Sequence, residues 1–173
     1  DSSLCAISDS DIGYTYGNPI ITKRPSDGKW VVIFASGYNN VSPGTGRGFL
    51  YVVDAADGTI LEKIDTGVGD TTTPSGLAKI TGRAENAQTD NTASTIDGGD
   101  LLGNLWRFDM ATNTVVKLAV LTTPDAGNAV QPITSRPDVG LCENNPMVYV
   151  GTGKYLGVSD LTDIQTQSMY GIK

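Results

Sequence analysis

Three acidic residues in the second half of the chain are the side chains best suited to chemistry. Asp97, Asp100 and Asp109 lie in or beside the stretch GGDLLGNLWRFDM, Gly98 to Met110. A pair of carboxylates can serve as general acid and general base without histidine, so a catalytic pair drawn from these three residues is one hypothesis. Their spacing does not single out any two of them, and a structural role in turns is the alternative.

The composition excludes most other chemistries. The chain has 173 residues and no histidine, which removes the commonest general base and the commonest metal ligand. Zinc-type and Ser-His-Asp catalysis are therefore not expected. The glycine-rich stretch SPGTGRG, Ser42 to Gly48, lacks the Gly-Lys-Ser/Thr that completes a phosphate-binding loop, and it is interpreted as a hairpin loop. With 19 acidic against 12 basic residues and a net charge of -7, nucleic acid is not an expected partner.

The sequence favours an exported protein without a transmembrane segment. Its longest unbroken apolar run, WVVIFA, is far shorter than the roughly 20 residues that a membrane-spanning helix needs. The chain starts at Asp1 without a charged-then-apolar leader, so any secretory signal would lie outside these residues. Few charges and many small polar residues favour a disulfide between Cys5 and Cys142. Two buried thiols, or a bridge from either cysteine to one elsewhere, are the alternatives.

A repeat gives the candidate residues their structural context. The stretch GFLYVVDAADGTIL, Gly48 to Leu61, aligns with GNLWRFDMATNTVV, Gly103 to Val116, at a constant offset of 55 positions, 103 minus 48. A third and weaker copy, MYGIK, lies at Met169 to Lys173. Self-similarity at such a period is the sequence signature of repeat architectures.

Strand-like segments flank each copy. A strand ending in small residues precedes each copy, and an alternating strand follows the first two. Further upstream of the first and third copies lies a short apolar strand opened by proline, which cannot donate to a β-ladder. The strands that precede the three copies are WVVIFASGY, ASTIDGGD and MVYVGTGKY. Those that follow the first two copies are TILEKI and TVVKLAVL, and the upstream strands are NPIIT (Asn18 to Thr22) and QPITS (Gln131 to Ser135).

Four strands per unit at intervals of about 45–55 residues are typical of β-propeller blades. No window shows helical periodicity of comparable length. The sequence therefore predicts an all-β fold, a partial β-propeller with four-stranded antiparallel blades. About two and a half blades are expected in one propeller fragment, residues 1–173, at approximately 18–64, 76–121 and 130–173. The third blade should stop after its third strand.

Within each blade, an aspartate is expected to stabilise the turn after the third strand. Asp54 and Asp109 can accept backbone N–H groups there, and Gly58 and Asn113 can adopt the left-handed conformation that such a turn requires.

The apolar run of the second copy is predicted to pack between blades. Leu105, Trp106 and Phe108 are interpreted as packing residues rather than as a ligand platform. Trp106 is expected on the opposite face of its strand from its two apolar neighbours, filling the gap to an adjacent blade.

A family resemblance becomes specific on these motifs. GYTYGNPIITK, WVVIFASGYNN, LYVVDAADGTILEKIDTGVG, GGDLLGNLWRFDM, QPITSRP and VGTGKYLG together resemble the C-terminal propeller of PilY-type type IV pilus proteins, from about Gly13 to Lys173. The resemblance implies an exported, non-enzymatic biogenesis factor and tip-associated adhesin. Such a protein supports pilus assembly or opposes retraction and mediates surface attachment. It would act with pilins and the pilus assembly machinery, and with a host or abiotic surface ligand, at the cell surface, pilus tip or outer membrane.

Two other functions share the predicted fold. One is a generic carbohydrate- or protein-binding propeller, since a fold does not determine a function. The other is a quinoprotein dehydrogenase, whose blades carry a similar Asp-x-x-x-Gly hairpin followed by a blade-docking tryptophan. The matching positions here are Glu62 and Lys117, and the adjacent cysteine pair seen in many of those enzymes is missing.

The resemblance also implies a place for calcium. PilY-type propellers often carry an EF-hand-like loop before the Gly-Asp-Leu-Leu-Gly run, and the matching ligand positions here are Asn86, Gln88, Asp90 and Ser94. Only one of the four is charged, and Glu85 could add a second charge if the loop is shifted by one residue. Because ligand charge sets much of the affinity, the expected calcium dissociation constant is roughly 10⁻³ M or weaker. No other cofactor is expected, and a simple polar connecting loop is the alternative.

Overall fold

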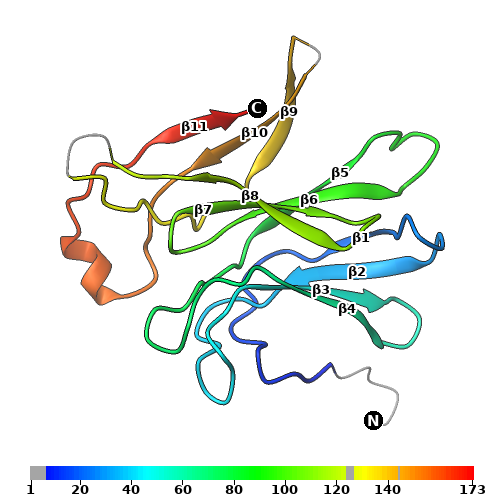
Figure 1. The fold of residues 1–173 in the computed structure, drawn as a ribbon, viewed down its shortest axis with the longest axis horizontal. Coiled ribbons are helices and arrows are strands. Elements are labelled where there is room, and N and C mark those ends of the chain that lie inside the picture. The colour runs from blue at the N-terminus through cyan, green and yellow to red at the C-terminus, as the bar shows by residue number, and fades with distance from the viewer. Residues whose placement is uncertain (1–6, 124–126, 144) are drawn as a thin grey trace.

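The strands of the protein form three antiparallel sheets that follow one another along the chain (Figure 1). The computed structural model describes residues 7–123, 127–143 and 145–173. The first sheet has the order β1-β2-β3-β4, the second β5-β6-β7-β8 and the third β9-β10-β11. The strands are β1 (Ile20–Lys23), β2 (Trp30–Ala35), β3 (Phe49–Asp54), β4 (Ile60–Asp65), β5 (Ile80–Ala84), β6 (Ala93–Gly99), β7 (Asn104–Asp109), β8 (Thr114–Val120), β9 (Asp138–Cys142), β10 (Asn145–Gly151) and β11 (Met169–Ile172).

This architecture confirms the predicted all-β fold and partial propeller. The two complete sheets have four strands each, and the third ends after its third strand. The described ranges contain no α-helix, and their one helical segment is the short 3₁₀ helix η1 (Val158–Thr162). None of their helices is long and apolar enough to cross a membrane.

The two predicted hairpin turns have the expected chemistry. Asp54 accepts the backbone N–H two residues further on at 2.9 Å, and Asp109 accepts the N–H groups two and three residues on at 2.8 and 3.0 Å. Gly58 and Asn113 adopt the left-handed conformation, with φ of 79° and 54°. Both aspartates are therefore turn-stabilising residues, as expected from their place after the third strand.

An apolar core joins the first two sheets. Alternation along β2 and β3 directs one set of side chains toward the second sheet, and Trp106 and Phe108 of β7 enter the same core. Leu105 lies in a separate core against the third sheet. The three residues are thus confirmed as packing residues. Trp106 faces away from Leu105 as expected, but the expectation that it also faces away from Phe108 was wrong. Residues two apart on a strand share a face.

The segment QPITS, residues 131–135, does not form the first strand of the third sheet as predicted; β9 occupies that place. Its backbone N–H groups bond to residues beside the second sheet instead. The N–H of Gln131 donates to the carbonyl of Leu121, and that of Ile133 donates to the carbonyl of Asp100. Ile133 packs against Gly99 so closely that a Cβ on residue 99 would lie 2.2 Å from the side chain of Ile133. The segment therefore fastens the third sheet to the second.

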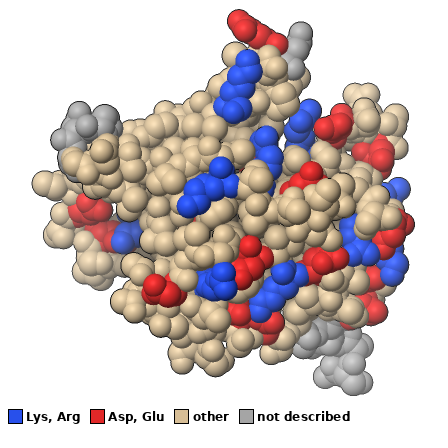
Figure 2. Space-filling view, in the orientation of Figure 1, with Lys and Arg blue, Asp and Glu red and all other residues tan. Residues whose placement is uncertain are grey.

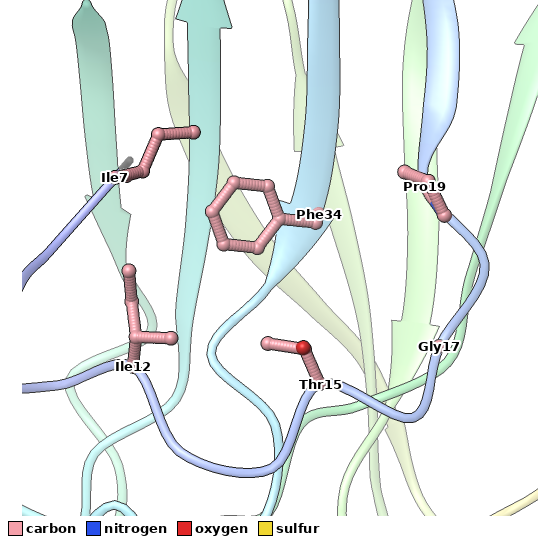
Figure 3. Close-up of a pocket in the computed structure, with 6 residues that line it drawn as sticks. All are labelled: Ile7, Ile12, Thr15, Gly17, Pro19 and Phe34. Atoms are coloured by element: carbon pink, nitrogen blue, oxygen red, sulfur yellow. The ribbon is translucent and has the colours of Figure 1, made fainter. Parts of the chain in front are cut away.

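The face of the first sheet turned away from the second is covered by residues 7–16, which we call the strap. Ile7 and Ile12 of the strap pack against the buried cluster of Phe49, Tyr51 and Val53. Figure 3 shows both isoleucines turned toward the ring of Phe34 across a hollow of about 300 Å³. This face is therefore shielded by the protein's own chain.

The corresponding outer face of the third sheet is open among the described residues. Met169 occupies the place that Leu50 and Leu105 hold in the first two copies, where each lies fully buried beneath the next sheet. Met169 itself is 75% exposed, and with Tyr149 it lines a surface hollow of about 500 Å³. The third sheet thus presents an apolar face of the kind that a neighbouring blade covers.

Candidate functional site

The loop between β5 and β6 carries the predicted calcium ligands. The backbone carbonyl of Asn86 accepts the N–H groups of Thr89 and Asp90 at 2.9 and 2.7 Å, which closes a compact turn. The loop is attached to the first sheet at Asn91, whose carbonyl accepts the N–H of Lys23 at 2.9 Å. The loop therefore has a defined backbone at the junction of the first two sheets.

A small polar hollow of about 160 Å³ lies beside this turn. Asn86, Asp90 and Ser94 line it together with Glu85, so three of the four predicted ligands and the alternative carboxylate meet there. Gln88 lines a neighbouring hollow instead. Glu85 and Asn86 line this second hollow too, so the two hollows adjoin and Gln88 lies beside part of the predicted set.

The hollow holds little negative charge for a cation. Its carboxylates are those of Glu85 and Asp90, and Asp90 already accepts a hydrogen bond from Thr92 at 2.6 Å. Ser94 Oγ is buried without a hydrogen-bond partner among the described residues. No group of three or more His, Cys, Asp or Glu side chains that could hold a metal ion is found in the described ranges. Calcium binding here stays a prediction.

The three carboxylates considered for catalysis have separate tasks. Asp97 forms a two-point ion pair with Arg107, with N–O distances of 2.8 and 3.1 Å. Burial raises the pKa of Asp97, although Arg107 opposes this effect. Backbone N–H groups lower the pKa of Asp109 in its turn. Because each carboxylate is committed to different partners, the geometry gives no support to a catalytic pair.

Asp100 is the centre of a buried hydrogen-bond network that the motif GDLLGNLW encodes. Its carboxylate accepts the backbone N–H groups of Leu102 and Asn104, at 3.0 and 2.9 Å, and the side-chain amide of Asn104 at 2.9 Å. The indole N–H of Trp106 donates at 2.9 Å, and Ser75 Oγ donates from the linker before the second sheet at 3.2 Å. The motif is thus architectural, because one carboxylate holds the turn, the tryptophan and the linker together.

A second polar cluster holds the strap on the first sheet. Lys63 Nζ of β4 lies 2.7 Å from Asp9 and 2.8 Å from Asp11 of the strap. Asp9 also accepts the hydroxyl of Tyr51 at 2.9 Å, and Asp11 accepts the N–H of Thr45 at 2.6 Å. Sequence reasoning missed this cluster, since nothing local in the sequence ties Asp9 to Lys63.

These contacts shift the ionisation of the strap cluster. Burial alone would raise the pKa of Asp9 and Asp11, but hydrogen bonds, those from Lys63 foremost, outweigh it and place the pKa of each carboxyl below its usual value. Burial alone would lower the pKa of Lys63, but its bonds to both carboxylates outweigh it and raise that pKa. The ionised forms of all three groups are therefore favoured by folding.

We expect strap attachment to depend on pH at both extremes. Lowered carboxyl pKa values contribute stability that is present above the unfolded pKa of about 4 and lost as pH falls through the folded values. The raised pKa of Lys63 contributes stability below about 10.4, which is lost as pH rises further. Lys63→Met should lower the free energy of unfolding by about 1–2 kcal/mol at pH 7, since it leaves two carboxylates without their cation.

Urea denaturation at pH 7 and pH 3 measures this effect. The difference between wild type and Lys63→Met should shrink at pH 3, where the carboxyls are protonating. Lys29→Met is the control, because Lys29 lies at 3.4 Å from the turn residue Asp54 and is more exposed. A difference that stays constant between the two pH values would contradict the assignment.

The disulfide prediction lies only partly within the described residues. Cys142 is exposed at the end of β9, and it is not one of two buried thiols. Cys5 lies outside the described residues. A bridge between them, or from Cys142 to another chain segment, stays a prediction.

Comparison with known proteins places this arrangement in a family. Residues 5–119 match the family model described as the PilY1 beta-propeller domain. A type IV pilus biogenesis factor PilY1 homolog of Xylella fastidiosa is 28% identical over 95% of this chain, and the PilY1 of Pseudomonas aeruginosa PAO1 is 28% identical over 94%. The chain spans only 12% and 16% of the lengths of these relatives.

A solved structure gives the same result for the fold. The crystal structure of the Pseudomonas aeruginosa PilY1 C-terminal domain matches 94% of this chain with a TM-score of 0.75 and 26% identity, and the chain covers 37% of that structure. The family model spans more than half of the chain, and it includes the whole of the first two sheets except the last residue of β8. The chain therefore belongs to the PilY1 β-propeller family.

Proposed function

We propose that this chain is the propeller region of a non-enzymatic type IV pilus biogenesis factor. It supports pilus assembly or opposes retraction, and it takes part in surface attachment as a tip-associated adhesin. The family match over residues 5–119 carries this proposal, and relatives named as pilus biogenesis factors support it. The protein would be exported and act at the cell surface, pilus tip or outer membrane, in contact with pilins and the assembly machinery.

A deletion of this region in its native gene tests the proposal. We expect a strong loss of surface pili and of attachment, with surface pili regained when retraction is also blocked if the region opposes retraction. A pull-down with the major and minor pilins distinguishes a pilus factor from a carbohydrate- or protein-binding propeller of other function. Unchanged piliation and attachment together with no pilin capture would refute the proposal.

The structure argues against the quinoprotein alternative at two positions. Where those enzymes place a docking tryptophan, Glu62 lies 3.6 Å from Arg24 and Lys117 lies over the ring of Trp106, 5.0 Å from its centroid. Asp97, Asp100 and Asp109 are committed to structural bonds. Incubation with a quinone cofactor should therefore give neither binding nor dehydrogenase activity.

We propose that calcium binds only weakly at the loop before β6. Glu85 and Asp90 supply its carboxylates, with Asn86 and Ser94 as neutral oxygens. With two charges on a solvent-exposed loop, the expected dissociation constant is about 10⁻³ M or weaker. Any bound ion would be held through Asp90 and backbone carbonyls.

Calorimetry on protein stripped with chelator tests the calcium prediction. Asp90→Ala should abolish whatever weak binding is present, while Asp57→Ala, in an exposed turn of the first sheet, should leave it unchanged. Micromolar binding that disappears in Asp90→Ala would show that the loop is a true high-affinity site and that the argument from charge is wrong.

A further inference from the structure

Three arginines lie near one buried aspartate where the second and third sheets meet. Arg83 lies on β5 and Arg107 on β7, and Arg136 immediately precedes Pro137 and β9. Asp97, on β6 between them, is only 1% exposed. We call Arg83, Arg107 and Arg136 the arginine cluster.

Strand register places these groups on one face. Asp97 lies directly opposite both Thr81 on β5 and Arg107 on β7. Arg83 is two residues from Thr81 and so shares its face. Arg136 reaches the same point from the third sheet, because its Nη2 donates to Thr81 Oγ1 at 3.4 Å.

The charges in this cluster do not balance. Arg107 forms its two-point ion pair with Asp97, and the field of Arg83 also acts on Asp97 and lowers the pKa that burial raises. Glu85 is a weak partner of Arg83, at 3.8 Å and 60% exposed. Asp138 lies opposite Tyr149 and lines the same surface hollow as Arg136, but no ion pair joins these two side chains among the described residues. Asp97 is therefore shared by Arg107 and Arg83, and Arg136 forms no ion pair among the described residues.

The equivalent interface between the first two sheets shows that packing does not require these charges. Val52 matches Arg107 at the offset of 55, and Ile33 lies opposite Val52 as Asp97 lies opposite Arg107. Both apolar residues are buried in the core between the first two sheets. The ionic groups are therefore specific to the interface between the second and third sheets. A buried ion pair by itself adds little stability over a pair of apolar side chains.

The cluster is accessible to a ligand. The side chain of Arg107 is 28% exposed and that of Arg83 32%, and Arg136 is exposed. On the face shown in Figure 2, basic side chains gather near the place where the third sheet meets the second, although the chain as a whole is acidic. Arginine offers paired N–H donors that match carboxylate and phosphate oxygens.

We propose that the arginine cluster is an oxyanion-binding site between the second and third sheets, for a carboxylate or phosphate group of a ligand. The bound oxygens take donors from Arg83 and Arg136, and the N–H groups of Arg107 that Asp97 does not use complete the site. Asp97 holds Arg107 in place and limits the net charge, so that the site selects an anion of one or two charges.

Calorimetric titration of the full chain with inorganic phosphate and, separately, with succinate tests this site at constant low ionic strength. We expect saturable binding of at least one of the two anions, and the better one identifies the ligand group as phosphate or carboxylate. Arg83→Gln and Arg136→Gln should each weaken it about tenfold or more, because each removes charge-assisted hydrogen bonds. Both residues are partly or fully exposed, so these variants should remain folded.

Arg47→Gln provides the matched control. Arg47 lies on the first sheet's side of the molecule and pairs with Asp65 at 3.1 Å, so its loss changes net charge equally without touching the cluster. Binding that is unchanged in Arg47→Gln and lost in the two cluster variants supports the proposal. No saturable binding of either anion, or an equal loss in all three variants, overturns it.

Discussion

Replacement of Asp100 by alanine is expected to destabilise the protein by about 3–5 kcal/mol, because it removes the acceptor shared by a buried network. Two backbone N–H groups, the Asn104 amide, the Trp106 indole and Ser75 would all lose a partner at a fully buried position. For a chain of this size each kcal/mol corresponds to roughly 2–4 °C in the midpoint of thermal unfolding. A decrease of about 6–20 °C is therefore expected.

Asp109→Ala is the matched control for this prediction. Asp109 also accepts backbone N–H groups in a turn, but the turn is exposed, so water can replace the lost acceptor. The expected cost is about 1 kcal/mol or less. Equal thermal shifts in the two variants, measured by circular dichroism, would show that the Asp100 network does not stabilise the linker and the tryptophan as described.

A polypeptide of these residues alone is expected to self-associate through the open face of the third sheet. Tyr149 and Met169 remain exposed there on a sheet face whose counterparts in the first two sheets are buried. Contiguous apolar surface of this kind is rare on monomers and marks an interaction site. Light scattering should show dimers at micromolar concentrations.

Met169→Glu should weaken this association by about tenfold or more, since it places a charge in the centre of the contact. Leu161→Glu in η1 is the control, because Leu161 is similarly apolar and 63% exposed but lies outside the sheet. A wild-type polypeptide that stays monomeric at all concentrations would show that the open face does not require a covering partner.

The repeat made much of the fold predictable. The copies at residues 48–61 and 103–116 became the β3–β4 and β7–β8 hairpins, because their alternation and turn residues are local properties. The first strands of the second and third sheets, β5 and β9, were harder to predict. β5 contains Gly82 and Arg83 in place of an apolar pattern, and β9 begins after Pro137 rather than at the apolar segment that resembled β1. Tertiary bonds to the second sheet decided the place of residues 131–135.

The candidate sites also differ in how far they could be predicted from local sequence. Glu85, Asn86, Asp90 and Ser94 meet because they are close in sequence, whereas the position of Gln88 depends on a turn that composition does not reveal. The arginine cluster joins residues from two strands, β5 and β7, and from the linker before β9. One sequence signal does point to it, since the offset of 55 puts arginine where the first copy has Val52. The strap contacts with Lys63 left no such signal.

The strap also limits the symmetry of any assembly formed by these residues. Because residues 7–16 cover one flank of the row of sheets, the flank with Tyr149 and Met169 is the one that the described residues leave open. A single self-complementary patch produces a closed pair related by a two-fold axis, whereas an open filament requires two different patches on each subunit. Association through this face should therefore stop at two copies, and release of the strap would supply the second patch needed for continued growth.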